Sequence, residues 1–113
     1  MEIVIVTGGR NYSDKDKVYE ILNSLEIHAV VHGGASGADS LAAQWASENE
    51  VEHHRWNAAW DKYGPAAGPK RNIAMLDAYI GTDPLVIVFP GGKGTAHCRK
   101  EAFKRGFRIK DII

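Results

Sequence analysis

The stretch Leu85-Val86-Ile87-Val88-Phe89-Pro90-Gly91-Gly92-Lys93-Gly94-Thr95 starts as a run of large apolar residues and ends as a glycine-rich turn. Two other apolar runs, Ile3-Val4-Ile5-Val6 and Ala29-Val30-Val31, are also continuous and mostly β-branched. Such runs are typical of strands that are buried on both faces, as in a parallel sheet. Weaker strands are predicted for residues 52–56 and 107–109.

Helical patterns separate these strands. A helix with one apolar face is predicted after Ser13, its expected N-cap, and others are predicted for residues 39–49, 71–80 and 95–105. The order is βαβαβ, a long loop, then αβαβ. It predicts one doubly wound α/β domain over residues 1–113, with right-handed crossovers and a parallel sheet of about five strands in the order 3-2-1-4-5.

Composition narrows the function classes. The chain has 113 residues and a formal net charge of zero, from 14 basic and 14 acidic residues, so general electrostatic capture of nucleic acid is not expected. No apolar run approaches the ~20 residues that a membrane span needs. The single cysteine, Cys98, excludes an internal disulfide, and with no export signal we expect a cytoplasmic protein. Self-association as a homo-oligomer is compatible with this fold.

Glycine-rich turns follow the strong strands, at residues 7–10, 33–39 and 90–95. In the expected order these strands are neighbours, so the turns meet at one carboxyl edge, where open α/β sheets bind ligands. Glycine permits close backbone approach, and helix N-termini attract anions. One such turn is ordinary turn chemistry. Turns on three adjacent strands favour a site for phosphate or a similar oxyanion.

Candidate ligand-binding residues lie in or beside these turns. Arg10 and Arg71 are suited to bidentate phosphate contact, and Thr95 to a helix cap that also donates to phosphate. Asp39 has two open interpretations, a first-turn helix charge or a hydrogen-bond acceptor for ribose hydroxyls. The full set is Gly8, Gly9, Arg10, Gly33, Gly34, Ser36, Gly37, Asp39, Arg71, Asn72, Pro90, Gly91, Gly92, Lys93, Gly94 and Thr95.

Several other chemistries find no support in the sequence. Neither G-x-x-x-x-G-K-[ST] nor G-x-G-x-x-G occurs, which argues against an ATPase or a nicotinamide dehydrogenase. Adjacent His53 and His54 would point to opposite faces of a strand, so no metal and no cofactor are expected. The long loop, residues 57–69, holds Trp60 and Tyr63, which either stack on a base or anchor the loop.

The turn Pro90-Gly91-Gly92-Lys93-Gly94-Thr95 resembles the PGGxGT motif of the SLOG superfamily, which includes the Lonely Guy phosphoribohydrolases and the DprA/Smf DNA-processing proteins. Residues 7–10, 32–39, 60–64 and 67–75 are similar to the YspA/YpsA-related branch. The resemblance covers nearly the whole chain. It implies a Rossmann-like three-layer α/β domain that binds a nucleotide or a nucleotide-derived ligand, such as an ADP-ribose derivative, as a sensor or binding domain.

The Lonely Guy enzymes release a base from a nucleoside monophosphate with an arginine and a glutamate that follows PGGxGT. Arg71 matches that arginine. The glutamate's place is taken by His97, or by Cys98 if the register slips by one, and Glu101 lies one helical turn after His97 on the same face. A neutral histidine brings no negative charge to an oxocarbenium-like transition state. An N-glycosidic hydrolase with Arg71, His97 and Glu101 as catalytic residues is therefore the alternative function. Single-stranded nucleic-acid binding, as in DprA/Smf, is a second alternative that the zero net charge disfavours.

Overall fold

The computed structural model describes residues 1–113, which form one sheet of five strands with helices on both sides. The strands are β1 (Glu2–Thr7), β2 (Ile27–His32), β3 (Glu52–Arg55), β4 (Leu85–Val88) and β5 (Arg108–Asp111). Their order is β3-β2-β1-β4-β5, and every neighbouring pair is parallel. The predicted fold class and strand order are confirmed.

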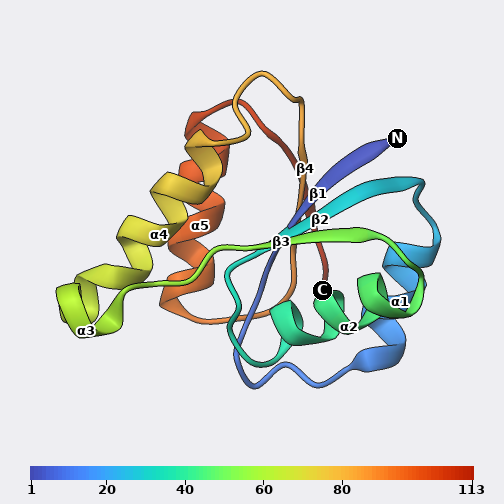
Figure 1. The fold of residues 1–113 in the computed structure, drawn as a ribbon, viewed down its shortest axis with the longest axis horizontal. Coiled ribbons are helices and arrows are strands. Elements are labelled where there is room, and N and C mark those ends of the chain that lie inside the picture. Colours follow the sequence, from blue (N-terminus) through green and yellow to red (C-terminus); the bar gives the residue numbers. More distant parts are fainter.

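The helices make the outer two of three layers. They are α1 (Lys15–Asn23), α2 (Ala38–Glu48), α3 (Trp60–Tyr63), α4 (Ala67–Asp77) and α5 (Lys93–Lys104). Helices α1 and α2 cover one face of the sheet and α4 and α5 cover the other, while the short α3 lies at one end of the molecule (Figure 1). None of these helices has both the length and the apolar character needed to cross a membrane.

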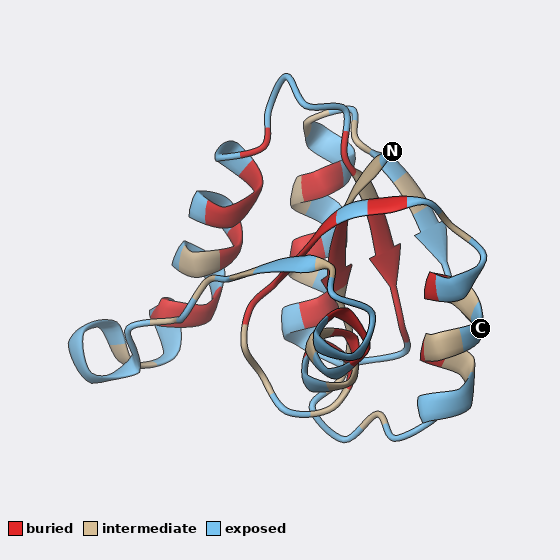
Figure 2. Ribbon diagram, turned by 45° about the vertical axis from the view of Figure 1, so that its right-hand side comes forward, coloured by how far each residue is buried: buried red, intermediate tan, exposed pale blue.

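Each face of the sheet has its own apolar core. Side chains alternate along a strand, so Val4 and Val6 of β1 join the core under α1 and α2, whereas Ile5 joins the core under α4 and α5. Buried residues therefore concentrate on the central strands and on the helix faces turned toward them (Figure 2). Cys98 of α5 is fully buried in the second core, where burial raises the pKa of its thiol to about 11. Cys98 is therefore a core residue.

Helix α1 starts one residue later than predicted. Its N-cap is Asp14 rather than Ser13, because the Asp14 carboxylate accepts a hydrogen bond from the Lys17 amide at 3.1 Å. An N-cap side chain must reach the third helical amide, and Ser13 lies one residue too early to do so. Strand boundaries at Arg55 and Arg108 differ from prediction by one residue, a normal scatter for element ends.

The predicted long loop is mostly helical, which is the largest correction to the fold. It contains α3, a 3₁₀ turn (Gly64–Ala66) and the first turn of α4. Gly68-Pro69 suggested a loop, but a proline in the first helical turn lacks only an amide that has no partner within the helix. Consequently Arg71 and Asn72 lie inside α4 rather than at its start, with their side chains directed by a regular helix.

Candidate functional site

A cavity of about 930 Å³ opens at the carboxyl edge of the sheet. Its walls come from the turn after β1, the turn between β4 and α5, and the α3–α4 segment. Stretches 8–10 and 90–95, far apart in the sequence, thus line the same space. The predicted site residues in its lining are Gly8, Gly9, Arg10, Asp39, Arg71, Asn72, Pro90, Gly91, Gly92, Lys93, Gly94, Thr95 and His97.

The turn after β1 is held between the other two glycine turns. The Gly9 amide donates to the Pro90 carbonyl at 2.9 Å, and the Ala38 amide donates to the Gly9 carbonyl at 3.3 Å. A Cβ atom on Gly91 would lie 2.6 Å from the Gly9 nitrogen, so the absence of a side chain there serves contact between turns. Gly92 differs, because a Cβ atom added to it would have no other atom within 4 Å, which leaves space for a ligand.

Two helices begin at this edge without a side-chain cap. The N-caps of α2 and α5 are Gly37 and Gly92, and neither helix has a capping side-chain hydrogen bond. Thr95 is not the N-cap predicted for it, since α5 starts at Lys93 and places Thr95 in the first turn. The first amides of α5 and the positive end of its dipole therefore lie at the cavity wall, an arrangement that favours an anion.

Arg71 joins the ends of two strands to α4. Its Nη1 donates to the carbonyl of Gly33, after β2, and to that of Trp56, after β3, the latter at 3.2 Å. A Cβ atom on Gly33 would overlap this guanidinium, so Gly33 provides room for Arg71. No carboxylate pairs with Arg71, and its Nη2 donates to no protein atom. Arg71 therefore brings to the cavity a positive charge that forms no ion pair.

Asn72 links Arg71 to α5. Its Oδ1 accepts from Arg71 Nε at 3.0 Å, and its buried amide nitrogen donates to the carbonyl of Gly94 at 3.3 Å and to Nδ1 of His97 at 3.2 Å. With Nδ1 accepting, a neutral His97 carries its proton on Nε2. His97 then offers the cavity a hydrogen-bond donor at that nitrogen.

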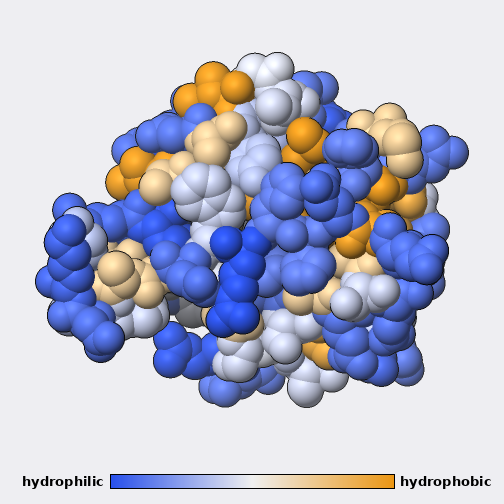
Figure 3. Space-filling view, in the orientation of Figure 1, coloured by the Kyte–Doolittle hydropathy of each residue, from blue (hydrophilic) through white to orange (hydrophobic).

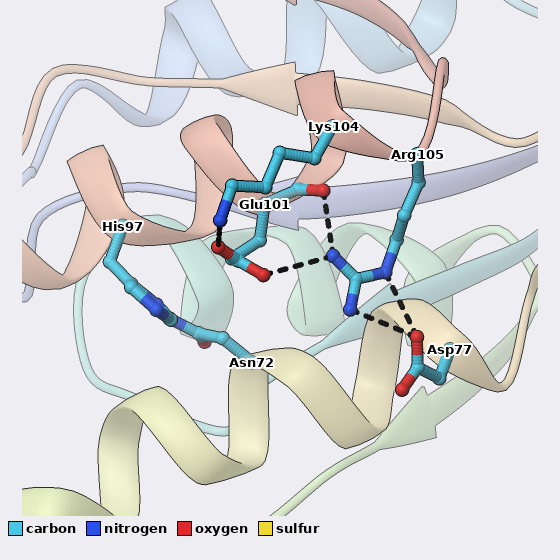
Figure 4. Close-up of polar contacts among 6 residues, drawn as sticks. All are labelled: Asn72, Asp77, His97, Glu101, Lys104 and Arg105. Atoms are coloured by element: carbon cyan, nitrogen blue, oxygen red, sulfur yellow. Dashed lines mark hydrogen bonds and ion pairs between the residues drawn. The ribbon is translucent and has the colours of Figure 1, made fainter.

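Glu101 does not line the cavity. Its carboxylate bonds to Lys104 at 3.0 Å and to Arg105 at 3.1 Å, and no hydrogen bond joins it to His97 (Figure 4). These hydrogen bonds hold the pKa of Glu101 below its usual value. The structure therefore does not bring Glu101 together with Arg71 and His97, since ion pairs along the helix engage it instead.

Asp39 is the only carboxylate in the cavity lining. It is 5% exposed, and its Oδ2 accepts from the amides of Gly33 at 3.0 Å and Ala35 at 3.4 Å. Its Oδ1 is buried and has no hydrogen-bond partner. Burial raises the pKa of Asp39 to about 6, although those amides and Arg71 oppose the shift. One oxygen thus shapes the turn after β2, and the other is left without a donor.

A raised pKa predicts a specific pH dependence. Between the usual value near 3.8 and about 6, native Asp39 binds more protons than the unfolded chain, so its contribution to stability falls as pH rises through that window. Replacing Asp39 with asparagine removes this term. We expect the stability of the native protein relative to Asp39→Asn to fall by about 2 kcal/mol between pH 4 and pH 7, measured by urea unfolding. A difference independent of pH would contradict the assignment.

Fewer residues of the turn after β2 line the main cavity than the sequence predicts. Gly33, Gly34 and Ser36 line an adjoining cavity of about 480 Å³, and Gly37 lines neither. Gly37 has φ +79° and packs against the backbone of residues 9–10, so its role is structural. The turn is also held by buried His32, whose Nδ1 accepts from the Gly34 amide at 3.1 Å. Burial lowers the pKa of His32 to about 4, so it is neutral at pH 7.

Of the loop aromatics, only Trp60 lines both cavities, and it is 51% exposed. Trp56, directly before the loop, packs against the core under α4 and α5. Tyr63 lies outside both cavities, with Lys70 Nζ 4.8 Å from its ring centre. No group of three or more histidine, cysteine, aspartate or glutamate side chains is arranged to hold a metal ion.

Comparison with known proteins now identifies the family. The YAcAr family, described as the YspA, cpYpsA-related SLOG family, matches residues 2–63. The chain belongs to this family. The match includes the turns after β1 and β2, and the turn at 90–95 lies beyond it.

One similar protein and one similar solved structure also match the rest of this SLOG protein. The Gene 61 protein of Mycobacterium phage D29 is 39% identical over an alignment of 124 positions, which covers 96% of this chain and 94% of that protein. The X-ray structure of DNA processing protein A (DprA) from Streptococcus pneumoniae matches all of this chain with a TM-score of 0.72 and 18% identity. This chain spans 50% of that one, and the likeness shows a shared fold.

Sequence reasoning missed several lining residues of the SLOG domain. They are Thr7, Asn11, Tyr12, Ala35, Pro65, Gly68 and Pro69 in the main cavity, and Arg55, Asn57 and Ala58 in the adjoining one. Asn11 and Tyr12 directly follow the first glycine turn, which was the available signal. No signal in the sequence pointed to Arg55, because only the fold brings the end of β3 beside the turn after β2.

Proposed function

We propose that this SLOG protein is a binding domain or sensor for a nucleotide or a nucleotide-derived compound of the ribose-phosphate or ADP-ribose type. The observation that carries the proposal is the shared cavity. Two glycine turns, the uncapped start of α5 and Arg71, which forms no ion pair, all line it. Its volume of about 930 Å³ falls in the range of about 300–1,000 Å³ that is common for small-molecule sites.

The phosphate would bind at the start of α5. Amides at a helix N-terminus and the Thr95 hydroxyl supply donors there, and Arg10 and Arg71 supply charge. The open space at Gly92 and Gly94 lets an oxyanion approach the backbone. Lys93 adds a further cation, with no carboxylate partner among the ion pairs of the protein.

The nucleoside would lie between α3 and the turn after β2. Trp60 offers a large aromatic face for stacking by a base, a contact worth about 1–3 kcal/mol per base. Asp39 Oδ1 supports recognition of a ribose hydroxyl, because a buried acceptor without a partner is stabilised by a donor.

The test is a thermal-shift panel with AMP, GMP, CMP, ADP-ribose, NAD and inorganic phosphate at millimolar concentration. A ligand at about 100 times its dissociation constant adds about 2.7 kcal/mol, which raises the midpoint by several degrees. We expect a selective shift with at least one nucleotide. No shift with any compound, on protein shown to be folded, contradicts the proposal. An oligodeoxythymidine at low salt tests binding of single-stranded nucleic acid. We expect this binding to be weak, because the net charge of the chain is zero.

Cleavage of an N-glycosidic bond is the second candidate, favoured by Arg71, His97 and Asp39 lining one cavity. The carboxylate for this chemistry would be Asp39 rather than Glu101, because Asp39 is buried at the cavity and Glu101 is paired elsewhere. Release of free base from a nucleoside monophosphate, followed by chromatography, tests it. We expect Asp39→Asn to abolish such turnover and Glu101→Gln to leave it unchanged. If no bound nucleotide releases its base, the hydrolase candidate is wrong and binding is the function that remains.

A further inference from the structure

The arginines of the chain divide into two groups by their partners. One group forms ion pairs with carboxylates at 2.8 to 3.2 Å, and consists of Arg99, Arg105 and Arg108. The other group forms no ion pair, and consists of Arg10, Arg55 and Arg71. The proposed phosphate site explains why Arg10 and Arg71 are unpaired. It does not explain Arg55, which does not line the main cavity.

All three unpaired arginines line the adjoining cavity of about 480 Å³, and no acidic residue does. The rest of its wall is the turn after β2, residues 57–58 and Trp60. Arg10, Ala35, Trp60 and Arg71 line both cavities, so the two spaces are neighbours. On the face seen in Figure 3, strongly hydrophilic residues lie between the end of the molecule that carries α3 and the part that carries α1 and α2.

Arg55 is held in place by neutral groups. Its Nε donates to Asn57 Oδ1 at 2.7 Å, and its Nη2 lies 3.5 Å from the carbonyl of Gly34. Gly34 has φ +74°, and a Cβ atom there would overlap the Arg55 side chain, so the turn is shaped around this guanidinium. These contacts orient Arg55 and leave its charge uncompensated.

Three arginines and no acidic residue line this one space, an excess of positive charge that favours an anion there. Guanidinium groups bind phosphate oxygens in a bidentate manner, which makes phosphate the anion that this arrangement fits. The main cavity already supplies a separate phosphate position at the start of α5.

We propose that the adjoining cavity is a second phosphate subsite, with Arg55 as its specific ligand, and that the protein prefers nucleotides with two separate phosphate groups. The class includes nucleoside bisphosphates and dinucleotides. The inference rests on the proposed function, because the second phosphate belongs to the same ligand whose first phosphate would bind at the start of α5. Arg10 and Arg71 serve both subsites, and Arg55 serves only the second.

Calorimetric titration with AMP, adenosine 3′,5′-bisphosphate and the dinucleotide pApA tests the proposal. At least one doubly phosphorylated probe is expected to bind about tenfold or more tightly than AMP. Arg55→Gln removes that advantage and leaves AMP affinity within about threefold. The matched control is Arg99→Gln, an exposed arginine that lines neither cavity and leaves every affinity unchanged.

Two results overturn the subsite. One is that no doubly phosphorylated probe binds more tightly than AMP while AMP binds, which leaves the proposed function standing. The other is that Arg55→Gln weakens AMP and the larger probes equally, which makes Arg55 part of the first site or of the fold. If neither AMP nor any other nucleotide binds the native protein, the proposed function fails and the subsite fails with it.

Discussion

Replacing Arg71 with glutamine is expected to weaken nucleotide binding by about 10- to 100-fold, the loss typical of a charged hydrogen-bond partner. The same change leaves the carbonyl groups of Gly33 and Trp56 without their donor. We therefore also expect the free energy of unfolding to fall by about 1–3 kcal/mol. Calorimetry and urea unfolding measure the two effects on the same preparation.

The conservative variant separates charge from geometry. Arg71→Lys keeps the positive charge, but an ammonium cannot hold two carbonyl groups and Asn72 in one plane. We expect it to recover part of the affinity and little of the stability. Affinity within about threefold of the native protein in Arg71→Gln would show that Arg71 is a structural tie between strand ends and not a ligand contact.

Gly91→Ala is expected to be the most damaging of the glycine substitutions in the turn before α5. Its Cβ atom would lie 2.6 Å from the Gly9 nitrogen and 2.9 Å from Thr95 Cβ, and the backbone of a neighbouring turn gives way only at a cost. Overpacking of this kind costs about 1–3 kcal/mol of unfolding free energy. Because the turns after β1 and β4 would separate, nucleotide affinity is expected to fall by about tenfold or more as well.

Gly92→Ala is the matched comparison. No atom lies within 4 Å of the place its Cβ would take, and its φ is negative, so we expect a smaller loss of stability than in Gly91→Ala. Its affinity is nevertheless expected to fall, because the methyl group occupies space left for the ligand. Equal loss of stability in both variants would mean that the turn–turn contact at Gly91 does not hold the site together.

The fold was predictable because burial on both faces leaves a strong pattern. Val4 and Val6 pack in one core and Ile5 packs in the other, so the strand appears in the sequence as a continuous apolar run. The start of α4 was not predictable in the same way. Gly68-Pro69 is compatible with a loop and with a first helical turn, and packing of Trp60 over Gly68 accompanies the helix in the structure.

The site was predictable where it follows a strand directly and not where it depends on distant contacts. Residues 8–10 and 90–95 line the cavity as expected, since parallel strands end at one edge. Glu101 shares the helical face expected for a partner of His97, but Arg105 and Lys104 engage it. Arg55 joins the site only through its approach to Gly34, a contact between residues 21 positions apart.

Titration of isotopically labelled protein with AMP, followed by amide NMR, tests most directly whether the glycine turns form a nucleotide site. We expect shifts at the amides of Gly9, Gly92 and Gly94 and at the indole of Trp60, all of which line the main cavity. Amides of β5 and of the second half of α5 are expected to stay unchanged. Absence of shifts, or shifts confined to those distant amides, would contradict the account.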